Sequence, residues 1–313
     1  MERVRLGRTG LQVSRMGIGA GGPSQIGRKT GLDESASVDL LLRAFDAGVN
    51  LVDSSEAYGT EAIIGRALQA RVRGDIVIST KKSTRRQEVT PATLMESLDG
   101  SLQQLGTDYI DIYNLHGVVP QDYRRFVDDI YPTLEAARDA GKIRFLGVTA
   151  MFNEDLEHVM LTEALADDLW DVVMVGFNLL NQSARDAVLA AARRQDVGVQ
   201  VMFAVRKALS SGDHLREFVD VLITMGEIDA DDVNRDEPLD FVVEALASSI
   251  PDAAYRFCRD EPGVHVVLSG TGNADHLTAN LQSFQRPALP AETTQRLRHI
   301  FRNVASTTGQ RVG

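Results

Sequence analysis

"VNLVDSSEAYGTE", residues 49–61, contains the signal from which the fold can be worked out. Val49 to Val52 have the apolar character of a short buried strand, and Asp53 ends that strand. Tyr58 follows one short turn later. A strand that runs into the interior and ends on a carboxylate, with a tyrosine close behind, needs an explanation. The side chains at the ends of the other predicted strands provide that explanation.

Seven further apolar runs of strand length lie along the chain, and amphipathic segments of helical period separate most of them. The runs are too apolar for half-exposed strands, which indicates a parallel sheet covered by helices. Eight such units in 313 residues favour a closed (β/α)8 TIM barrel of the α/β class over an open doubly wound sheet. The glycine-rich GIGAGGPSQIG opens no helix of the kind that a G-x-G-x-x-G phosphate turn needs. The seven runs are MGIGA (16–20), IVIST (76–80), YIDIYNL (109–115), FLGVT (145–149), DVVMVGF (171–177), GVQVMF (198–203) and VHVVLSG (264–270).

Several of the intervening segments have recognisable helix ends. The helix predicted before Gly48 has apolar residues at helical spacing and stops at that glycine. A later one places Thr90 at its N-cap, Pro91 at its first helical position and Gly106 past its end. A third is expected to begin at Asn153 as its N-cap, because acidic residues follow in the first turn.

The chain is predicted to be a single barrel domain, residues 1–313, with three additions. Apolar and polar residues alternate from Arg5 to Met16 around GRTG and predict an N-terminal β-hairpin. Residues 204–250 form a long loop or insert after strand seven that carries the acidic stretch EIDADDVNRDEPLD. It is either a solvated surface excursion or a lid on the active-site face, where loops after barrel strands lie. Residues 290–313 form a C-terminal helix and tail.

The composition narrows the class of protein. The chain has 43 % hydrophobic and 25 % charged residues, which are ordinary proportions for a soluble globular protein with a sizeable core. The formal net charge of −11 and the pI of about 5.1 argue against a nucleic-acid-binding surface. No apolar run approaches the roughly 18 residues of a membrane span, and the first ten residues lack the apolar stretch of a signal peptide. Cys258 is the only cysteine, which excludes an intrachain disulfide and a cysteine-rich metal site. We therefore expect a cytoplasmic protein with no nucleic-acid or membrane partner.

Four reactive side chains fall at the carboxyl ends of three consecutive predicted strands, where a barrel carries its function. Asp53 ends the second strand and Tyr58 lies in the loop behind it, whereas Lys81 follows the third strand and His116 closes the fourth. Taken singly, each has an ordinary structural explanation as a turn cap, a packing residue, an exposed lysine or a core histidine. Those explanations do not account for four such groups at one end of the barrel. We therefore interpret the four as a catalytic set.

Six stretches of the chain, in their order and spacing, resemble the aldo-keto reductase superfamily. The resemblance covers the whole predicted barrel and implies a (β/α)8 fold that binds a nicotinamide dinucleotide without a Rossmann domain. It also implies that the catalytic Asp, Tyr, Lys and His of that family fall on Asp53, Tyr58, Lys81 and His116. The six stretches are LGRTGLQVSRMGIGA (6–20), GVNLVDSSEAYGTE (48–61), IVISTKKS (76–83), QLGTDYIDIYNLHG (104–117), AGKIRFLGVTA (140–150) and VVLSGTGNADHLTANLQS (266–283).

The implied tetrad explains why the strand ends on a carboxylate. Reduction of a carbonyl needs a hydride on carbon and a proton on oxygen. A phenol, with a pKa near 10, holds its proton at neutral pH, so Tyr58 would be the donor and the Lys81 ammonium would ease the release. Asp53 would supply the counter-charge that a buried ammonium needs, and His116 would orient the carbonyl oxygen and stabilise its developing charge. Because side chains alternate along a strand, the family pattern selects Lys81, and Lys82 would face outward or stabilise the following loop.

The residues implied around the nicotinamide depart from the family's pattern. The family holds the carboxamide with a Ser-Asn pair after strand five and a glutamine in strand six. Here the pair is Thr149 followed by an alanine, and the glutamine position, four residues before Asn178, is Met174. The aromatic residue that stacks on the nicotinamide falls at Phe203 or one residue away. Arg206 or the lysine after it would hold the pyrophosphate, unless both are exposed to solvent.

The remaining implied dinucleotide contacts lie after the first and eighth strands. NADPH-preferring relatives carry cations at the positions that match Gly270 and His276, and only the histidine, with an ordinary pKa near 6.5, is partly charged at neutral pH. Thr271, Asn273 and the amides of a helix start are left to hold a phosphate. We therefore expect NADP(H) or NAD(H) as the cofactor, with weak discrimination between them. The implied cofactor residues are Ala20, Thr149, Asn178, Phe203, Arg206, Ser269, Gly270, Thr271, Gly272, Asn273, His276 and Asn280.

The sequence thus predicts an NAD(P)-dependent oxidoreductase that interconverts a carbonyl and an alcohol. Its small-molecule substrate would be an aldehyde, a ketone or an aldose. A nucleotide-binding regulatory or scaffold protein of the same fold, with little turnover, is the alternative, which the altered carboxamide contacts favour and the intact tetrad disfavours. A metal-dependent barrel hydrolase would need several histidine and carboxylate ligands at strand ends, and only His116 of the six histidines is well placed, so no metal site is expected. The sequence carries no signal for the oligomeric state.

Overall fold

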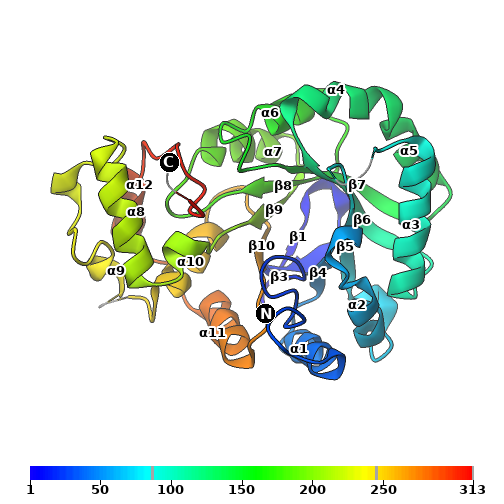
Figure 1. The fold of residues 1–313 in the computed structure, drawn as a ribbon, viewed down its shortest axis with the longest axis horizontal. Coiled ribbons are helices and arrows are strands. Elements are labelled where there is room, and N and C mark those ends of the chain that lie inside the picture. The colour runs from blue at the N-terminus through cyan, green and yellow to red at the C-terminus, as the bar shows by residue number, and fades with distance from the viewer. Residues whose placement is uncertain (86–87, 244–245, 312–313) are drawn as a thin grey trace.

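Eight parallel strands close into a barrel in the computed structural model, which describes residues 1–85, 88–243 and 246–311 (Figure 1). Each predicted apolar run overlaps one of these strands, so the (β/α)8 barrel is confirmed. Around the barrel the order is β10-β3-β4-β5-β6-β7-β8-β9, and every neighbouring pair is parallel. The strands are β3 (Met16–Gly19), β4 (Leu51–Asp53), β5 (Val77–Ser83), β6 (Ile110–Val118), β7 (Ile143–Ala150), β8 (Val172–Gly176), β9 (Gly198–Met202) and β10 (Val266–Ser269).

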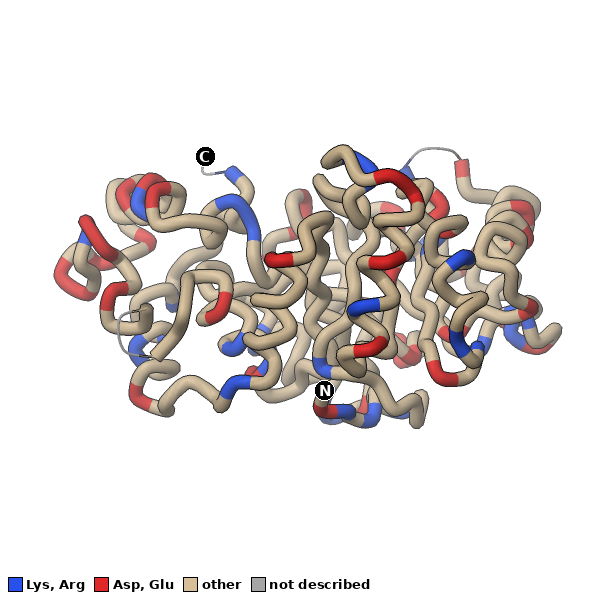
Figure 2. The backbone as a smooth tube through the Cα atoms, turned by 90° about the horizontal axis from the view of Figure 1, so that it is seen from below, with Lys and Arg blue, Asp and Glu red and all other residues tan. Residues whose placement is uncertain are grey.

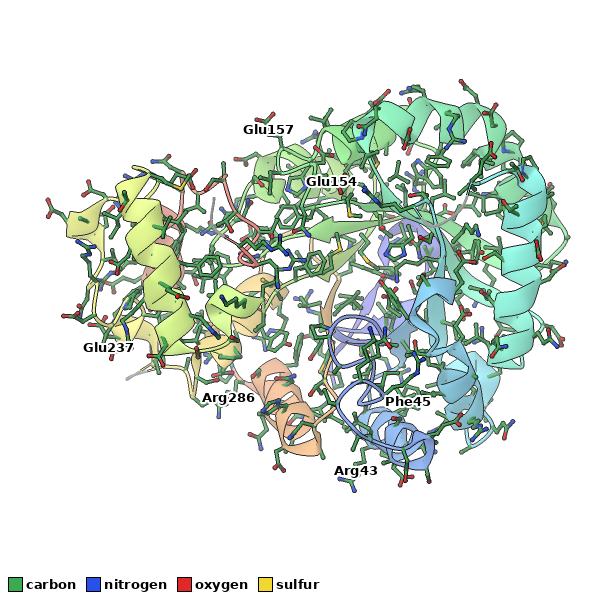
Figure 3. All side chains as sticks on the ribbon, viewed as in Figure 1. Arg43, Phe45, Glu154, Glu157, Glu237 and Arg286 are labelled. Carbon is green, nitrogen blue, oxygen red and sulfur yellow. The ribbon has the colours of Figure 1, made fainter. Side chains whose placement is uncertain are left out.

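Helices form the outer layer and cover the apolar outer faces of the strands. On α1, for example, Phe45 is buried against the barrel while Arg43 points outward (Figure 3). The helices are α1 (Glu34–Asp46), α2 (Glu61–Leu68), α3 (Pro91–Leu105), α4 (Pro120–Asp129), α5 (Tyr131–Asp139), α6 (Val159–Asp167), α7 (Ala190–Arg194), α8 (Gly212–Thr224), α9 (Asp240–Val243), α10 (Ile250–Arg259), α11 (Ala274–Gln285) and α12 (Ala291–Ile300). Within the residues described, no helix has both the length and the apolar character needed to cross a bilayer.

Helix ends follow the predicted residues at two of three places. The Thr90 hydroxyl caps α3 by accepting from the Thr93 amide, and Gly106 ends that helix with φ of +63°. Gly48, with φ of +91°, lies just beyond α1. The prediction for Asn153 is wrong, because α6 begins only at Val159.

Asp155, rather than Asn153, satisfies the first turn of α6. Its carboxylate accepts hydrogen bonds from the amides of Val159 and Met160, each at 2.9 Å. The Asn153 side chain instead accepts from Arg206 at 2.7 Å. Asparagine is a residue type that favours N-caps, but the Asn153 side chain contacts a residue that is distant in sequence and caps no helix.

The predicted N-terminal hairpin is present and closes the amino end of the barrel. β1 (Arg3–Arg5) pairs antiparallel with β2 (Gln12–Ser14). Apolar side chains of the hairpin, Leu6, Leu11 and Val13, pack against inward-facing residues at the amino ends of five strands. The amino end of the barrel is therefore filled by side chains. TIM barrels carry their active sites at the opposite, carboxyl end. The five inward-facing residues are Leu51, Val77, Ile112, Val172 and Val266.

In the part that the structure describes, the predicted long loop after β9 contains the α-helices α8 and α9, which lie together with α12 at one side of the molecule (Figure 1). The Arg296 guanidinium of α12 lies 3.8 Å from the ring centroid of Phe241. His299 and Arg302 both pair with Asp232. The C-terminal helix and the residues just after it therefore hold the insert. Figure 2 shows acidic and basic residues interspersed along the chain in that view.

Gln200 is a buried amide on the inner wall of the barrel. Gly198 packs against the side chain of Leu6 inside the barrel, so the side chain of Gln200, two residues later on β9, faces the same way. Neither polar atom of this side chain has a hydrogen-bond partner in the part of the chain that the structure describes. An unpaired buried amide costs about 1–3 kcal/mol of stability.

Gln200→Met is therefore expected to raise the free energy of unfolding by about 1–2 kcal/mol, because it keeps the shape and removes the unpaired amide. Urea denaturation measures this change. The exposed Gln103→Met on α3 is the control and should stay within about 0.5 kcal/mol of the wild type. A lower stability of Gln200→Met would contradict the prediction.

Candidate active site

Asp53 and Lys81 form a buried ion pair at the carboxyl ends of β4 and β5. The Lys81 ammonium lies 2.7 Å and 2.6 Å from the two carboxylate oxygens and donates to the Ser54 carbonyl at 2.5 Å. The Lys81 residue is 0 % exposed and Asp53 4 %. Burial raises the pKa of the Asp53 carboxyl, and the Lys81 ammonium and the Ser79 hydroxyl oppose that rise. The two charges are thus desolvated and depend on each other.

Tyr58 and His116 lie above this pair and are partly exposed. The Tyr58 hydroxyl is 3.2 Å from Nε2 of His116, and the two rings meet edge to face with centroids 5.5 Å apart. The Lys81 ammonium lies 5.3 Å from the centroid of the Tyr58 ring. Gly21 lies against that ring, since a Cβ at this position would be 2.5 Å from it. The structure therefore brings the four predicted catalytic side chains together at one opening.

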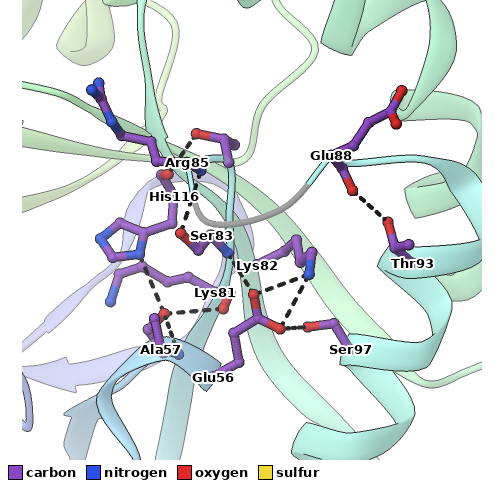
Figure 4. Close-up of polar contacts among 12 residues, drawn as sticks. Glu56, Ala57, Lys81, Lys82, Ser83, Arg85, Glu88, Thr93, Ser97 and His116 are labelled. Atoms are coloured by element: carbon purple, nitrogen blue, oxygen red, sulfur yellow. Dashed lines mark hydrogen bonds and ion pairs between the residues drawn. The ribbon is translucent and has the colours of Figure 1, made fainter.

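Lys82 follows Lys81 on β5 and lies on the other face of the strand, as predicted, but it is buried. Its ammonium lies 3.1 Å from Oε1 of Glu56, and the residue is 3 % exposed (Figure 4). Neighbouring lysines of one strand thus have different carboxylate partners on opposite faces of β5.

The sequence interpretation missed two serines of the site. Ser79 donates to Asp53 at 2.9 Å, and Ser55 lies 3.2 Å from Nδ1 of His116. A period of two along the strand could have identified Ser79, because it lies two residues before Lys81 and so shares its face. Ser55 follows the end of β4, where no periodicity applies, and so carried no such signal.

The residues that the sequence predicts to hold the nicotinamide already have partners within the protein. The Thr149 hydroxyl accepts from the Gly117 amide at 2.8 Å. Asn178 is fully buried, and its side chain binds the carbonyls of Phe203 and Thr308 and the amides of two residues that follow it. Ala20 is buried and donates its amide to the Asp53 carbonyl at 2.7 Å. These groups are therefore engaged in contacts within the protein, and those contacts shape the end of the barrel.

Arg206 is stacked on Phe203 at the end of β9. Its guanidinium carbon lies 3.5 Å from the ring centroid, and its Nη1 donates to Asn153 and to the hydroxyl of Thr308 in the C-terminal tail. Burial lowers the pKa of this guanidinium to about 10. Among the residues described, no carboxylate pairs with it. A partly desolvated cation with neutral partners is suited to an anionic ligand.

The loop after β10 packs against the loop after β3. A Cβ on Gly272 would come within 2.4 Å of Gly27, so the two loops touch at this glycine. Asn273 caps α11 by accepting from the amides of Asp275 and His276. Asn280 donates to the buried Ser269 hydroxyl at 2.9 Å. Gly270 and His276 are exposed, and Thr271 is partly exposed. The helix start is thus open to solvent, although Asn273 occupies two of its amides.

No cluster of three or more histidine, cysteine or carboxylate side chains suited to a metal ion occurs in the ranges that the structure covers.

Residues 15–302 match the sequence profile of the Aldo/keto reductase family. The chain belongs to the aldo/keto reductase family. It is 29 % identical over 242 residues to the NADH-specific methylglyoxal reductase of Escherichia coli (strain K12), which covers 70 % of this chain and 72 % of that protein. It is 25 % identical to aldo-keto reductase YhdN of Bacillus subtilis (strain 168), over 98 % of this chain and 95 % of that protein. The holo form of aldo-keto reductase AKR11C1 from Bacillus halodurans has the same fold, with a TM-score of 0.71, 22 % identity and 96 % coverage of both chains.

This aldo/keto reductase retains residues that fit a dinucleotide. The guanidinium of Arg206, which has neutral partners and no carboxylate partner among the residues described, lies beside the aromatic ring of Phe203 at the carboxyl end of β9. The start of α11 lies at the neighbouring strand and is open to solvent. A cation, a flat ring and a helix start on adjacent strands are groups that could hold the pyrophosphate, the nicotinamide ring and the adenosine end of such a ligand.

Proposed function

We propose that this aldo/keto reductase interconverts a carbonyl and an alcohol with NAD(P)(H), and that Tyr58 is its proton donor. The observation that carries the proposal is the stack of contacts at the carboxyl end of the barrel. Lys81 is held by Asp53 beneath the ring of Tyr58, whose hydroxyl lies 3.2 Å from His116. The relatives with reductase names support the same class of reaction.

Each side chain of the site has a separate task in this proposal. Tyr58 donates its proton to the carbonyl oxygen, and His116, at hydrogen-bond distance from the same hydroxyl, holds that oxygen and stabilises its charge. Lys81 lies under the phenol ring and favours the phenolate that forms when the proton leaves. Asp53 supplies the counter-charge that the buried Lys81 ammonium needs where water is excluded.

The cofactor would be held by Arg206, Phe203 and the loop after β10. When bound, NAD(P)H supplies the hydride that reaches the carbonyl carbon. In the present arrangement Arg206 covers one face of Phe203 and is bound to Thr308. Stacking of a ring on that face therefore needs the guanidinium to turn toward the pyrophosphate.

Turnover of purified protein with aldehydes, ketones and aldoses, followed by nicotinamide absorbance, tests the proposal. Methylglyoxal belongs in the panel because a relative is named for its reduction. A decay of absorbance that depends on the carbonyl is the expected result. Tight binding of the dinucleotide without turnover of any carbonyl would contradict it.

That contradicting result would favour a second candidate, a nucleotide-binding regulatory protein of the same fold. Two observations support it, and the first is that the Asn178 and Arg206 side chains already bind the tail at Thr308. The methionine at position 174 points the same way, since a thioether gives the carboxamide no strong hydrogen bond. The intact tetrad makes this the less favoured function.

NADH and NADPH are expected to bind with dissociation constants that differ by less than about 100-fold, or 2.7 kcal/mol, at pH 8. The reason is that Gly270 carries no charge and that the exposed imidazole of His276, unlike a guanidinium or an ammonium, is not a permanent cation. Fluorescence titration with both dinucleotides at pH 6 and pH 8 measures the ratio.

A preference for NADPH above that ratio at pH 8 would contradict the expectation and indicate a permanent cation. The loop after β3 offers Lys29, which is exposed and lies two residues after the contact between Gly27 and Gly272. Lys29→Met would then remove the preference, whereas the distant Lys142→Met is the matched control.

A further inference from the structure

The second buried lysine of β5, Lys82, also has a carboxylate of its own. Its ammonium lies 3.1 Å and 3.3 Å from the two oxygens of Glu56, on the opposite face of the strand from Lys81 (Figure 4). A buried ammonium needs such a partner, because the free energy lost on its desolvation exceeds the free energy gained from most single contacts. An apolar pair would fill this space without that cost. Stability alone therefore does not account for a charged pair at this place.

Glu56 binds donors from two elements at once. Besides Lys82, its Oε1 accepts from the Ser83 amide at 3.0 Å, and its Oε2 accepts from the Ser97 hydroxyl of α3 (Figure 4). The Ser97 hydroxyl is in turn 3.2 Å from that of the buried Tyr113. Several charge-assisted hydrogen bonds around one carboxylate fix its position.

The position of Glu56 sets that of Tyr58 because the two residues begin and end one short 3₁₀ turn, Glu56–Tyr58. Within the turn, the Tyr58 amide donates to the Ser55 carbonyl at 2.9 Å, and the Ala57 amide to the Ser55 hydroxyl at 3.3 Å. That hydroxyl also lies 3.2 Å from Nδ1 of His116. A displacement of Glu56 therefore moves the Tyr58 ring relative to His116.

We propose that Glu56 and Lys82 form a positioning pair, which holds the Tyr58 hydroxyl at the place where it transfers its proton. Neither residue contacts the reacting atoms, so the effect acts through the turn. Proton transfer needs its groups within about 0.5 Å of the productive geometry. The proposal rests on the proposed carbonyl reduction, in which Tyr58 is the donor.

The double variant Glu56→Gln/Lys82→Met tests the pair, since it removes both charges and leaves neither one buried alone. Its kcat is expected to fall about tenfold, while KM and the dissociation constant of the dinucleotide stay within about twofold. The solvent deuterium isotope effect on kcat should increase, because proton transfer becomes slower. Lys142→Met breaks an exposed ion pair with Asp99 and is the matched control, with no change expected.

A second measurement needs neither substrate nor cofactor. The ring ¹⁵N chemical shifts of His116, assigned with His116→Gln, report its hydrogen bonds to Tyr58 and Ser55. They should change in the double variant and stay constant in Lys142→Met. If the double variant does not fold, Glu56→Asp replaces it, because it keeps the charge but withdraws the carboxylate by one methylene. It should then show the same loss of kcat and the same shift change.

Unchanged kcat and unchanged His116 shifts, with a lower stability alone, would overturn the proposal and leave the pair a purely structural feature. Failure of the proposed function has a different signature: the wild type itself would reduce no carbonyl. In that event the His116 shifts would still decide whether Glu56 and Lys82 place Tyr58.

Discussion

Tyr58→Phe is expected to lower the turnover of a carbonyl substrate by at least about 10²-fold, the lower end of general-acid contributions. The change removes only the hydroxyl, which lies 3.2 Å from Nε2 of His116. The ring that Gly21 packs against is kept, so the shape of the site and the dissociation constant of the dinucleotide should remain nearly unchanged. Single-turnover kinetics with saturating cofactor measure the loss, and fluorescence titration measures binding.

Tyr109→Phe serves as the control for this change. Tyr109 precedes β6, at the end of the barrel opposite the tetrad, and its ring contacts the Arg73 guanidinium at 4.0 Å. Its variant should turn over within about twofold of the wild type. Near-normal turnover in Tyr58→Phe would show that another group supplies the proton.

Lys81→Met is expected to lower turnover by at least about 10²-fold and also to destabilise the fold by about 3–5 kcal/mol, because it leaves the Asp53 carboxylate buried without a counter-charge. Lys82→Met should cost turnover only about tenfold, since its carboxylate partner Glu56 is a quarter exposed and can be solvated. Turnover and urea denaturation of both variants measure the contrast. Loss of turnover in Lys82→Met with a mild effect in Lys81→Met would assign the catalytic role to the other face of β5.

The stability deficit of Lys81→Met should shrink as the pH falls. Burial raises the pKa of Asp53, and the variant lacks the ammonium that opposes this rise. The folded variant then binds a proton at pH values where the unfolded chain, with an ordinary Asp pKa of about 3.9, does not. Its free energy of unfolding therefore decreases as the pH rises through the folded-state pKa, and it is regained below that value. Asp53→Asn/Lys81→Met, which has no charge at either position, should lack this dependence.

The barrel could be predicted from the sequence because each of its strands is encoded by a short stretch of neighbouring residues. A buried parallel strand is a short apolar run, and each of the eight runs overlaps a strand of the structure. The capping of α3 by Thr90 follows from neighbouring residues alone. The start of α6 could not be predicted in this way, because Asn153 binds Arg206, which is 53 residues further along the chain. Local rules fail where a distant partner competes for a side chain.

The same division applies to the site. Strand ends and alternation were enough to place Asp53, Lys81 and His116 together, and to put Lys82 on the other face. Their catalytic roles stay predictions. The contact between Thr308 and Arg206 joins residues 102 positions apart and depends on how the tail crosses the barrel end. No periodicity or spacing encodes such a contact.

The burial of two of the five lysines has a consequence for covalent labelling. Lys29 and Lys207 are exposed and Lys142 partly so, whereas Lys81 and Lys82 are 0 % and 3 % exposed. An amine-selective acylating reagent should therefore modify the native protein at the first three side chains and spare the adjacent pair. Acylation of Lys81 or Lys82 would show that the carboxyl end of the barrel opens transiently and exposes these side chains. Inactivation by such a reagent before those openings occur would identify a lysine outside the catalytic set.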